Sequence, residues 1–143
     1  MKHFKDYFTT HPDSGVRFVA SDMILALHSD ASYNSEPKSK SRAAENYYIS
    51  KLNDEKFNNG TVLALSKIIK HVMTSALEAK VASLFYNYKS DIPLRISLEE
   101  MGHHQPKTPV TTDNTTAQGL IAKTMILKRA KSYDMIFNFL KCR

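Results

Sequence analysis

The sequence contains a single cysteine, Cys142, near its end. One thiol forms neither a disulfide framework nor a cysteine zinc site within a chain, and so few cysteines are typical of proteins in a reducing compartment. No apolar run approaches the ~20 residues of a membrane-spanning helix, and the start, Met-Lys-His-Phe-Lys-Asp, does not have the pattern of a secretory signal. These absences predict an intracellular protein with no membrane partner.

Acidic residues are the minority among the charged side chains. The 143-residue chain has 20 lysines and arginines against 14 aspartates and glutamates, which gives a net charge of +6. This balance favours polyanionic partners, nucleic acids among them, and carries no information about the fold. The sequence also lacks internal repeats and low-complexity tracts, and its 42% of hydrophobic residues suits one globular domain with a substantial core.

Three segments of strand-like residues follow one another in the first half of the chain. They are residues 23–30, 43–50 and 61–66. Turn-rich polar residues separate them, and consecutive strands joined by turns are typical of an antiparallel meander. The first segment ends in Asp30, on the same face as His28, because side chains alternate along a strand. We therefore predict a three-stranded antiparallel unit whose first strand ends in a carboxylate.

The polar segment 34–41 joins the first two of these strands. Basic side chains occupy every second position, at Lys38, Lys40 and Arg42. One interpretation of this segment is a solvated loop. The other is a basic edge that faces the phosphates of a nucleic acid.

The second half of the chain changes to a helical pattern. Apolar residues recur at helical spacing along one stripe: Leu77, Val81, Leu84, Phe85 and Tyr88. Ser75 is the predicted cap of this helix. Pro93 is expected to break the pattern, so that residues 98–101 form a short second helix closed by Gly102.

A fourth strand is predicted at residues 108–113, and it again ends in an acid, Asp113. Helices are expected after it, at residues 115–123 and 132–141. The order of elements predicts an α+β fold in which helices cover a mixed sheet. If the first and fourth strands are parallel neighbours, Asp30 and Asp113 lie at the same edge of that sheet.

Glu78 lies near the start of the predicted helix and can face both aspartates. Three converging carboxylates suit Mg²⁺, which keeps several waters and takes few carboxylates plus phosphate oxygens of a substrate. Two such ions can activate a water and stabilise the leaving oxygen of a phosphodiester. The alternative is that Glu78 is a surface residue beside Lys80.

Five short segments around these acids occur in the same order as in one known family. They are Ser-Asp-Ala-Ser-Tyr at 29–33, Ser-Glu-Pro-Lys-Ser-Lys-Ser-Arg-Ala at 35–43, Ser-Ala-Leu-Glu-Ala-Lys-Val-Ala-Ser-Leu-Phe at 75–85, Thr-Asp-Asn-Thr-Thr-Ala at 112–117 and Lys-Arg-Ala-Lys-Ser-Tyr-Asp-Met at 128–135. Over nearly its whole length, the chain resembles the ribonuclease H domain of copia-type retrotransposon Pol polyproteins.

The resemblance implies a ribonuclease H-like mixed sheet, with a three-strand antiparallel meander, a parallel fourth strand and the strand order 3-2-1-4-5. It implies cleavage of the RNA strand of an RNA–DNA hybrid by two Mg²⁺ ions, which Mn²⁺ can replace. Asp30, Glu78 and Asp113 would be the catalytic and metal-binding residues. The residues expected to contact the nucleic acid are Ser32, Lys38, Lys40, Arg42, Asn114, Lys128, Arg129 and Lys131.

The resemblance also implies a division of the chain and a location. Residues 20–143 would be the ribonuclease H-like domain, and residues 1–15, which include a predicted helix at 3–10, would link it to an upstream reverse transcriptase domain. The expected location is a cytoplasmic virus-like particle or the nucleus.

Two departures from the family pattern bear on activity. The fifth strand carries a fourth metal-binding aspartate in the family and should follow the last helix, but the chain ends at Arg143. Asp134 is a weak candidate for its substitute, because its surroundings match the helix before that strand. Lys80 stands where the family has a second acid. A domain incomplete at its C-terminus, lacking the fifth strand, would bind metal weakly and show reduced or absent cleavage.

Two alternatives stand beside the active nuclease. One is a catalytically impaired remnant that only binds nucleic acid or has no activity. The other is an unrelated α+β interaction module whose acids are incidental. Turnover that depends on Mg²⁺ separates the nuclease from the remnant.

Overall fold

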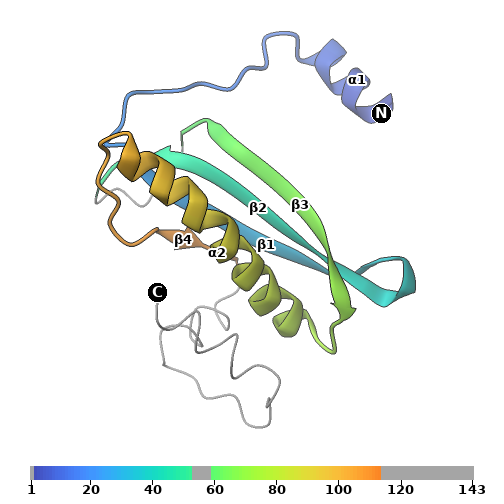
Figure 1. The fold of residues 1–143 in the computed structure, drawn as a ribbon. Coiled ribbons are helices and arrows are strands. Elements are labelled where there is room, and N and C mark those ends of the chain that lie inside the picture. Colours follow the sequence, from blue (N-terminus) through green and yellow to red (C-terminus); the bar gives the residue numbers. More distant parts are fainter. Residues whose placement is uncertain (1, 53–58, 114–143) are drawn as a thin grey trace.

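Figure 1 shows a computed structural model of the chain, which describes residues 2–52 and 59–113. The elements in chain order are α1 (Lys2–Thr10), β1 (Ile24–Glu36), the short helical turn η1 (Pro37–Ser39), β2 (Lys40–Ser50), β3 (Thr61–Val72), α2 (Ala76–Glu100) and β4 (Val110–Thr111). The strands form one mixed sheet, α2 lies across one face of it, and α1 lies apart from it (Figure 1). The predicted α+β class is confirmed.

The order of strands in the sheet is β3-β2-β1-β4. β1 pairs antiparallel with β2, and β2 pairs antiparallel with β3. β4 pairs in parallel with β1, Leu27 beside Val110 and His28 beside Thr111. Parallel neighbours need a long crossover connection, which α2 provides here. The predicted meander and the predicted parallel fourth strand are both confirmed.

β1 and β2 extend beyond the predicted strands and meet in a hairpin. The segment 34–41 is a largely exposed hairpin: its exposure to solvent agrees with the solvated-loop interpretation, but the end of β1 and the start of β2 flank the turn η1 where a loop was expected. Lys38 has a φ of 63°, the left-handed value at which the chain reverses. Arg42 Nε donates to Glu36 Oε1 across the hairpin at 2.6 Å. Polar residues form strand here because their side chains pair across β1 and β2.

α2 is one continuous helix through Pro93, so the predicted break there is wrong. Proline removes one backbone donor from a helix interior, but the residues that follow it carry apolar side chains that pack in the core. Leu94 and Leu98 pack against a cluster that includes Leu25. This burial outweighs the lost hydrogen bond. Residues 98–101 are thus the end of α2 and its cap rather than a second helix.

Both predicted caps are confirmed. At the start of α2, Ser75 Oγ accepts a hydrogen bond from the backbone N–H of Glu78 at 3.1 Å. At its end, the backbone N–H of Gly102 donates to the carbonyl oxygen of Glu99 at 2.9 Å. Gly102 has a φ of 91°, a value that side chains with a Cβ rarely adopt.

The core lies between α2 and the sheet. Two buried clusters make it up: Leu25, Leu27, Tyr47 and Leu98 in one, and Ala43, Ile69, Met73, Ala79 and Ala82 in the other. Of the predicted apolar stripe, Val81 and Leu84 are buried, whereas Leu77, Phe85 and Tyr88 are only partly buried. Ala79 and Ala82 of α2 are also buried against the sheet, where small side chains allow the two backbones to approach closely.

The predicted helix at residues 3–10 corresponds to α1. The helices predicted at residues 115–123 and 132–141 lie outside the described residues. Neither α1 nor α2 is long and apolar enough to cross a membrane.

Candidate functional site

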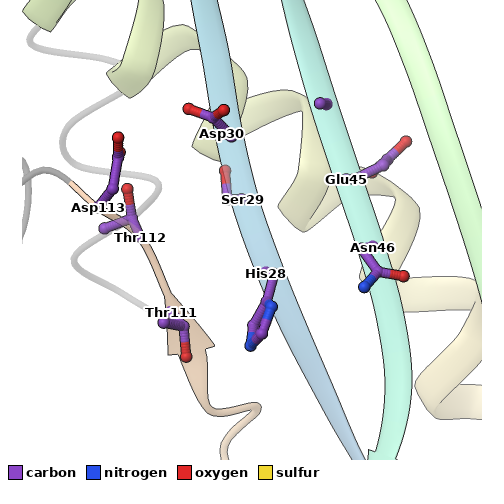
Figure 2. A pocket seen from close by; sticks show the side chains of 9 residues that line it. His28, Ser29, Asp30, Glu45, Asn46, Thr111, Thr112 and Asp113 are labelled. Atoms are coloured by element: carbon purple, nitrogen blue, oxygen red, sulfur yellow. The ribbon is translucent and has the colours of Figure 1, made fainter. Parts of the chain in front are cut away.

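Asp30 and Asp113 lie close together, as the sequence predicts, but neither ends a strand: β1 continues past Asp30 to Glu36, and Asp113 lies two residues beyond β4. His28 of β1 is paired with Thr111 of β4, and each aspartate comes two residues after its member of that pair. Parallel strands keep this register, so the two side chains extend from neighbouring positions. Figure 2 shows both carboxylates at the same end of the site.

The side-chain amine of Lys80 lies between these two carboxylates. Lys80 Nζ is 3.6 Å from Asp30 Oδ1 and forms an ion pair and hydrogen bond with Asp113 Oδ1. The lysine side chain is 16% exposed, whereas those of Asp30 and Asp113 are 67% and 66% exposed. A partly buried cation therefore links Asp30 within β1 to Asp113 just after β4.

In the structure, Glu78 caps the start of α2. Its carboxylate accepts hydrogen bonds from the backbone N–H and the hydroxyl of Thr74, while its own N–H donates to Ser75 Oγ. This is reciprocal capping, in which the first turn of a helix and the preceding loop satisfy one another. Glu78 does not line the pocket that holds Asp30 and Asp113. The structure thus brings together two of the three predicted carboxylates.

The carboxylates as they lie do not fit Mg²⁺ or Mn²⁺. Hard divalent cations need open oxygen ligands, but both aspartates are already paired with the ammonium group of Lys80. Among residues 2–52 and 59–113, no group of three or more His, Cys, Asp or Glu side chains is arranged to hold a metal ion. The metal chemistry predicted for Asp30, Glu78 and Asp113 therefore needs a rearrangement of Lys80.

A pocket of about 460 Å³ opens beside the two aspartates. It is lined by three consecutive residues from each of three neighbouring segments: His28, Ser29 and Asp30, Ala44, Glu45 and Asn46, and Thr111, Thr112 and Asp113. Figure 2 shows His28 and Thr111 side by side in this pocket. His28 and Asp30 share the face of β1 opposite the one on which Ser29 bonds to Asn87 of α2. The pocket therefore opens on the face of the sheet away from α2.

His28 and Asn46 are pocket residues that the sequence did not single out. His28 Nε2 is 3.0 Å from the Tyr48 hydroxyl, and the two rings meet edge to face at 4.8 Å. Burial raises the pKa of the Tyr48 hydroxyl. Asn46 Oδ1 is buried and has no hydrogen-bond partner in the described part of the chain. The period of two along β1, which places His28 on the same face as Asp30, is the signal that could have identified His28.

Basic side chains of the hairpin continue this face of the sheet. Arg42 lies opposite Ser32, two residues along β1 from Asp30, and residues two apart share a face. Arg42 is paired with Glu36 and also donates to Ser66 Oγ at 3.1 Å. The hydrogen bond and charge of Arg42 lower the pKa of Glu36. Arg42 is therefore already held within the protein.

Lys38 and Lys40 lie beside Arg42 in the same hairpin. Lys38 is exposed at the turn, and Lys40 is partly buried at the start of β2. Ser32, a further predicted contact, bonds through its hydroxyl to that of Ser35 at 2.5 Å. The remaining predicted residues lie outside the described part of the chain: Asn114, Lys128, Arg129, Lys131 and Asp134.

No family model, curated protein or solved structure matches the chain. The likeness to copia-type ribonuclease H domains therefore remains a prediction from the five sequence segments.

Proposed function

We propose that this chain is a ribonuclease H-like domain that binds RNA–DNA hybrids without cleaving them. The observation that carries this proposal is Lys80, whose single positive charge is paired with both Asp30 and Asp113 at the position where the family would hold metal. The β3-β2-β1-β4 order, with a helix between β3 and the parallel β4, supports the ribonuclease H-like part of the proposal.

The hairpin is the proposed contact with the phosphates. Lys38 is exposed in the turn η1 and Lys40 begins β2, next to Arg42, whose own charge is paired with Glu36. Cations in a row along a two-stranded ribbon suit a phosphate backbone, and binding through them releases counterions. The net charge of +6 acts in the same direction by attracting polyanions at long range.

A second candidate function is cleavage of the RNA strand by two Mg²⁺ ions, or Mn²⁺, at Asp30, Glu78 and Asp113. The observation that favours it is that Asp30 and Asp113 lie side by side with their carboxylates about two-thirds exposed. Ions from solution could reach them if Lys80 moved away. Glu78 would also have to leave Thr74 for this function.

In the parent element the partner would be a reverse transcriptase domain, and α1 is its proposed point of contact. α1 is amphipathic, and its aromatic side chains Phe4, Tyr7 and Phe8 are exposed. This role would place the protein inside the cell, in a cytoplasmic virus-like particle or in the nucleus.

One experiment tests both candidates. A hybrid labelled on its RNA strand is incubated with the whole chain in Mg²⁺, in Mn²⁺ and in EDTA, and binding is followed by fluorescence anisotropy. We expect binding in all three solutions, weakening as salt increases, with the RNA left intact. RNA cutting that Asp30→Asn abolishes would establish the nuclease instead, and a folded chain that does not bind would overturn both.

A matched pair of variants locates the contact. The double substitution of Lys38 and Lys40 by alanine is expected to lower the slope of log Kd against log salt by about 2, since each phosphate contact contributes about one. Lys107→Ala is the control, because Lys107 is exposed just before β4, away from the hairpin. Equal effects of the two changes would mean that the hairpin is not the binding surface.

A further inference from the structure

We infer that the ammonium group of Lys80 takes the place of a divalent cation between Asp30 and Asp113. Removing the charge at position 80 is then expected to create a site for hard divalent cations there. This inference goes beyond nucleic-acid binding and holds whether or not the chain binds a hybrid.

The helical period decides which side chain of α2 reaches Asp30 and Asp113. Successive residues of an α-helix are turned by 100°, so Glu78 and Lys80 point to opposite flanks. Ala79, between them, is fully buried against the sheet. With Glu78 turned toward Thr74, the flank of α2 that meets β1 and β4 presents an amine rather than a carboxylate.

Contacts around Lys80 fix this arrangement. Ser83, one turn further along α2, donates from its hydroxyl to the carbonyl oxygen of Asp30 at 2.7 Å. The backbone N–H of Ala31 donates to Asp30 Oδ1 at 2.7 Å, and this same oxygen faces Lys80 Nζ. Both the helix and the carboxylate are therefore held in place for the ion pair.

Electrostatics explains why the lysine is needed. Two neighbouring carboxylates repel each other, and a cation between them offsets that repulsion by attracting both. Lys80 does so from the same chain, and it also opposes the approach of any second cation. A methionine at position 80 would keep the aliphatic length while leaving two carboxylates and water, a ligand set that suits Mg²⁺ or Mn²⁺.

Binding of Mn²⁺ to the whole chain, measured by calorimetry and by electron paramagnetic resonance, tests the inference. We expect weak binding by the wild type and by Lys80→Arg, which keeps the charge. Lys80→Met is expected to bind about tenfold more tightly or better, because a nearby positive charge is removed. The added Asp30→Asn change in the Lys80→Met chain is expected to abolish that gain.

Thermal unfolding in EDTA gives a second readout that needs no metal. In the wild type, Asp30→Asn removes a partner of Lys80, so we expect a lower Tm. In the Lys80→Met chain the same change relieves repulsion with Asp113, so we expect a higher Tm. If Lys80→Met fails to fold, the direction of the Asp30→Asn shift in the wild type decides the question alone.

Three results would overturn the inference. One is tight Mn²⁺ binding by the wild type that depends on Asp30. Another is a Lys80→Met chain that folds and binds no better than the wild type. The third is a rise in Tm when Asp30→Asn is made in the wild type without metal. None of these measurements uses nucleic acid, so failure here and failure of hybrid binding are distinguishable.

Discussion

The hydroxyl of Thr108 lies 3.1 Å from each carboxylate oxygen of Asp91 and donates to that carboxylate. Asp91 belongs to α2 and is only 3% exposed, while Thr108 belongs to the loop that leads into β4. Arg95, one turn further along α2, donates to Thr108 Oγ1 and to the carbonyl oxygen of Gln105 at 2.9 Å each. A buried polar contact thus positions β4 and the segment after it, which carries Asp113.

The Asp91 carboxylate predicts a dependence of stability on pH. Burial raises its pKa in the folded chain, and the hydrogen bond from Thr108 and the charge of Arg95 only partly oppose this. The folded state therefore keeps the proton to a higher pH than the unfolded state. We expect the free energy of unfolding contributed by Asp91 to fall as pH rises from the ordinary aspartate pKa through the raised one.

Urea unfolding of the wild type and of Asp91→Asn at a series of pH values measures this contribution. The difference in unfolding free energy between the two chains should change across that window, because the unfolding free energy of the wild type falls relative to that of Asp91→Asn as pH rises. A difference that stays constant with pH would show that Asp91 has the same pKa in both states.

The hydroxyl of Tyr47 predicts a loss of stability when it is removed. It lies 2.5 Å from the carbonyl oxygen of Asn87 and 3.1 Å from Glu45 Oε2, and the side chain is fully buried. Tyr47→Phe removes both of these hydrogen bonds from the buried interior, which costs about 1–3 kcal/mol of unfolding free energy. Tyr33→Phe is the control, since Tyr33 is exposed and should change stability by less than about 0.5 kcal/mol. Equal effects would mean that the Tyr47 contacts are not formed.

The carboxylate of Glu78 predicts a stabilising role without metal. It accepts from Thr74 at the start of α2, where a negative charge also favours the helix dipole. We expect Glu78→Ala to lower the free energy of unfolding in EDTA by about 0.5–1 kcal/mol. Glu78→Gln, which keeps an acceptor oxygen, should lose less. Unchanged or higher stability of Glu78→Ala in EDTA would argue against capping and in favour of a carboxylate kept for a metal.

The left-handed backbone at Gly102 predicts sensitivity to alanine. Gly102→Ala places a Cβ at a φ of 91° and is expected to cost about 1 kcal/mol or more, although the space around it is open. Gly15→Ala is the matched control, because its surroundings are also open and its φ is not positive. Chemical denaturation of both variants measures the difference, and equal stabilities would contradict the strain.

The proximity of Asp30 and Asp113 shows how much of the fold could be predicted from the sequence. Each acid ends a strand-like run, and a helical stretch between the runs is long enough for a crossover. Rules of chain connection then place the two strands side by side in parallel and bring the two acids together, although β1 continues past Asp30 to Glu36. No knowledge of side-chain contacts is needed for this prediction, which is why it succeeds.

Pro93 and Lys80 show why other features could not be predicted. Local propensity places a break at proline, but burial of Leu94 and Leu98 beyond it decides the outcome. The ion pairs of Lys80 depend on the rotation of α2 about its axis. Of the predicted apolar stripe, Val81 and Leu84 are buried, but Ala79 and Ala82 are buried beside them while Phe85 and Tyr88 are only partly covered. Packing between elements sets both features.

β4 is short, and this has a consequence for motion. Its backbone pairs with β1 over two residues, and Leu27 N–H donates to the carbonyl oxygen of Pro109 just before it. A ladder with so few hydrogen bonds protects its amide hydrogens little from exchange. We therefore expect the amide hydrogens between β4 and β1 to exchange with solvent sooner than those between β1 and β2. We therefore expect β4 to detach from β1 locally while β1, β2 and β3 stay paired. Such an opening would separate Asp113 from Asp30.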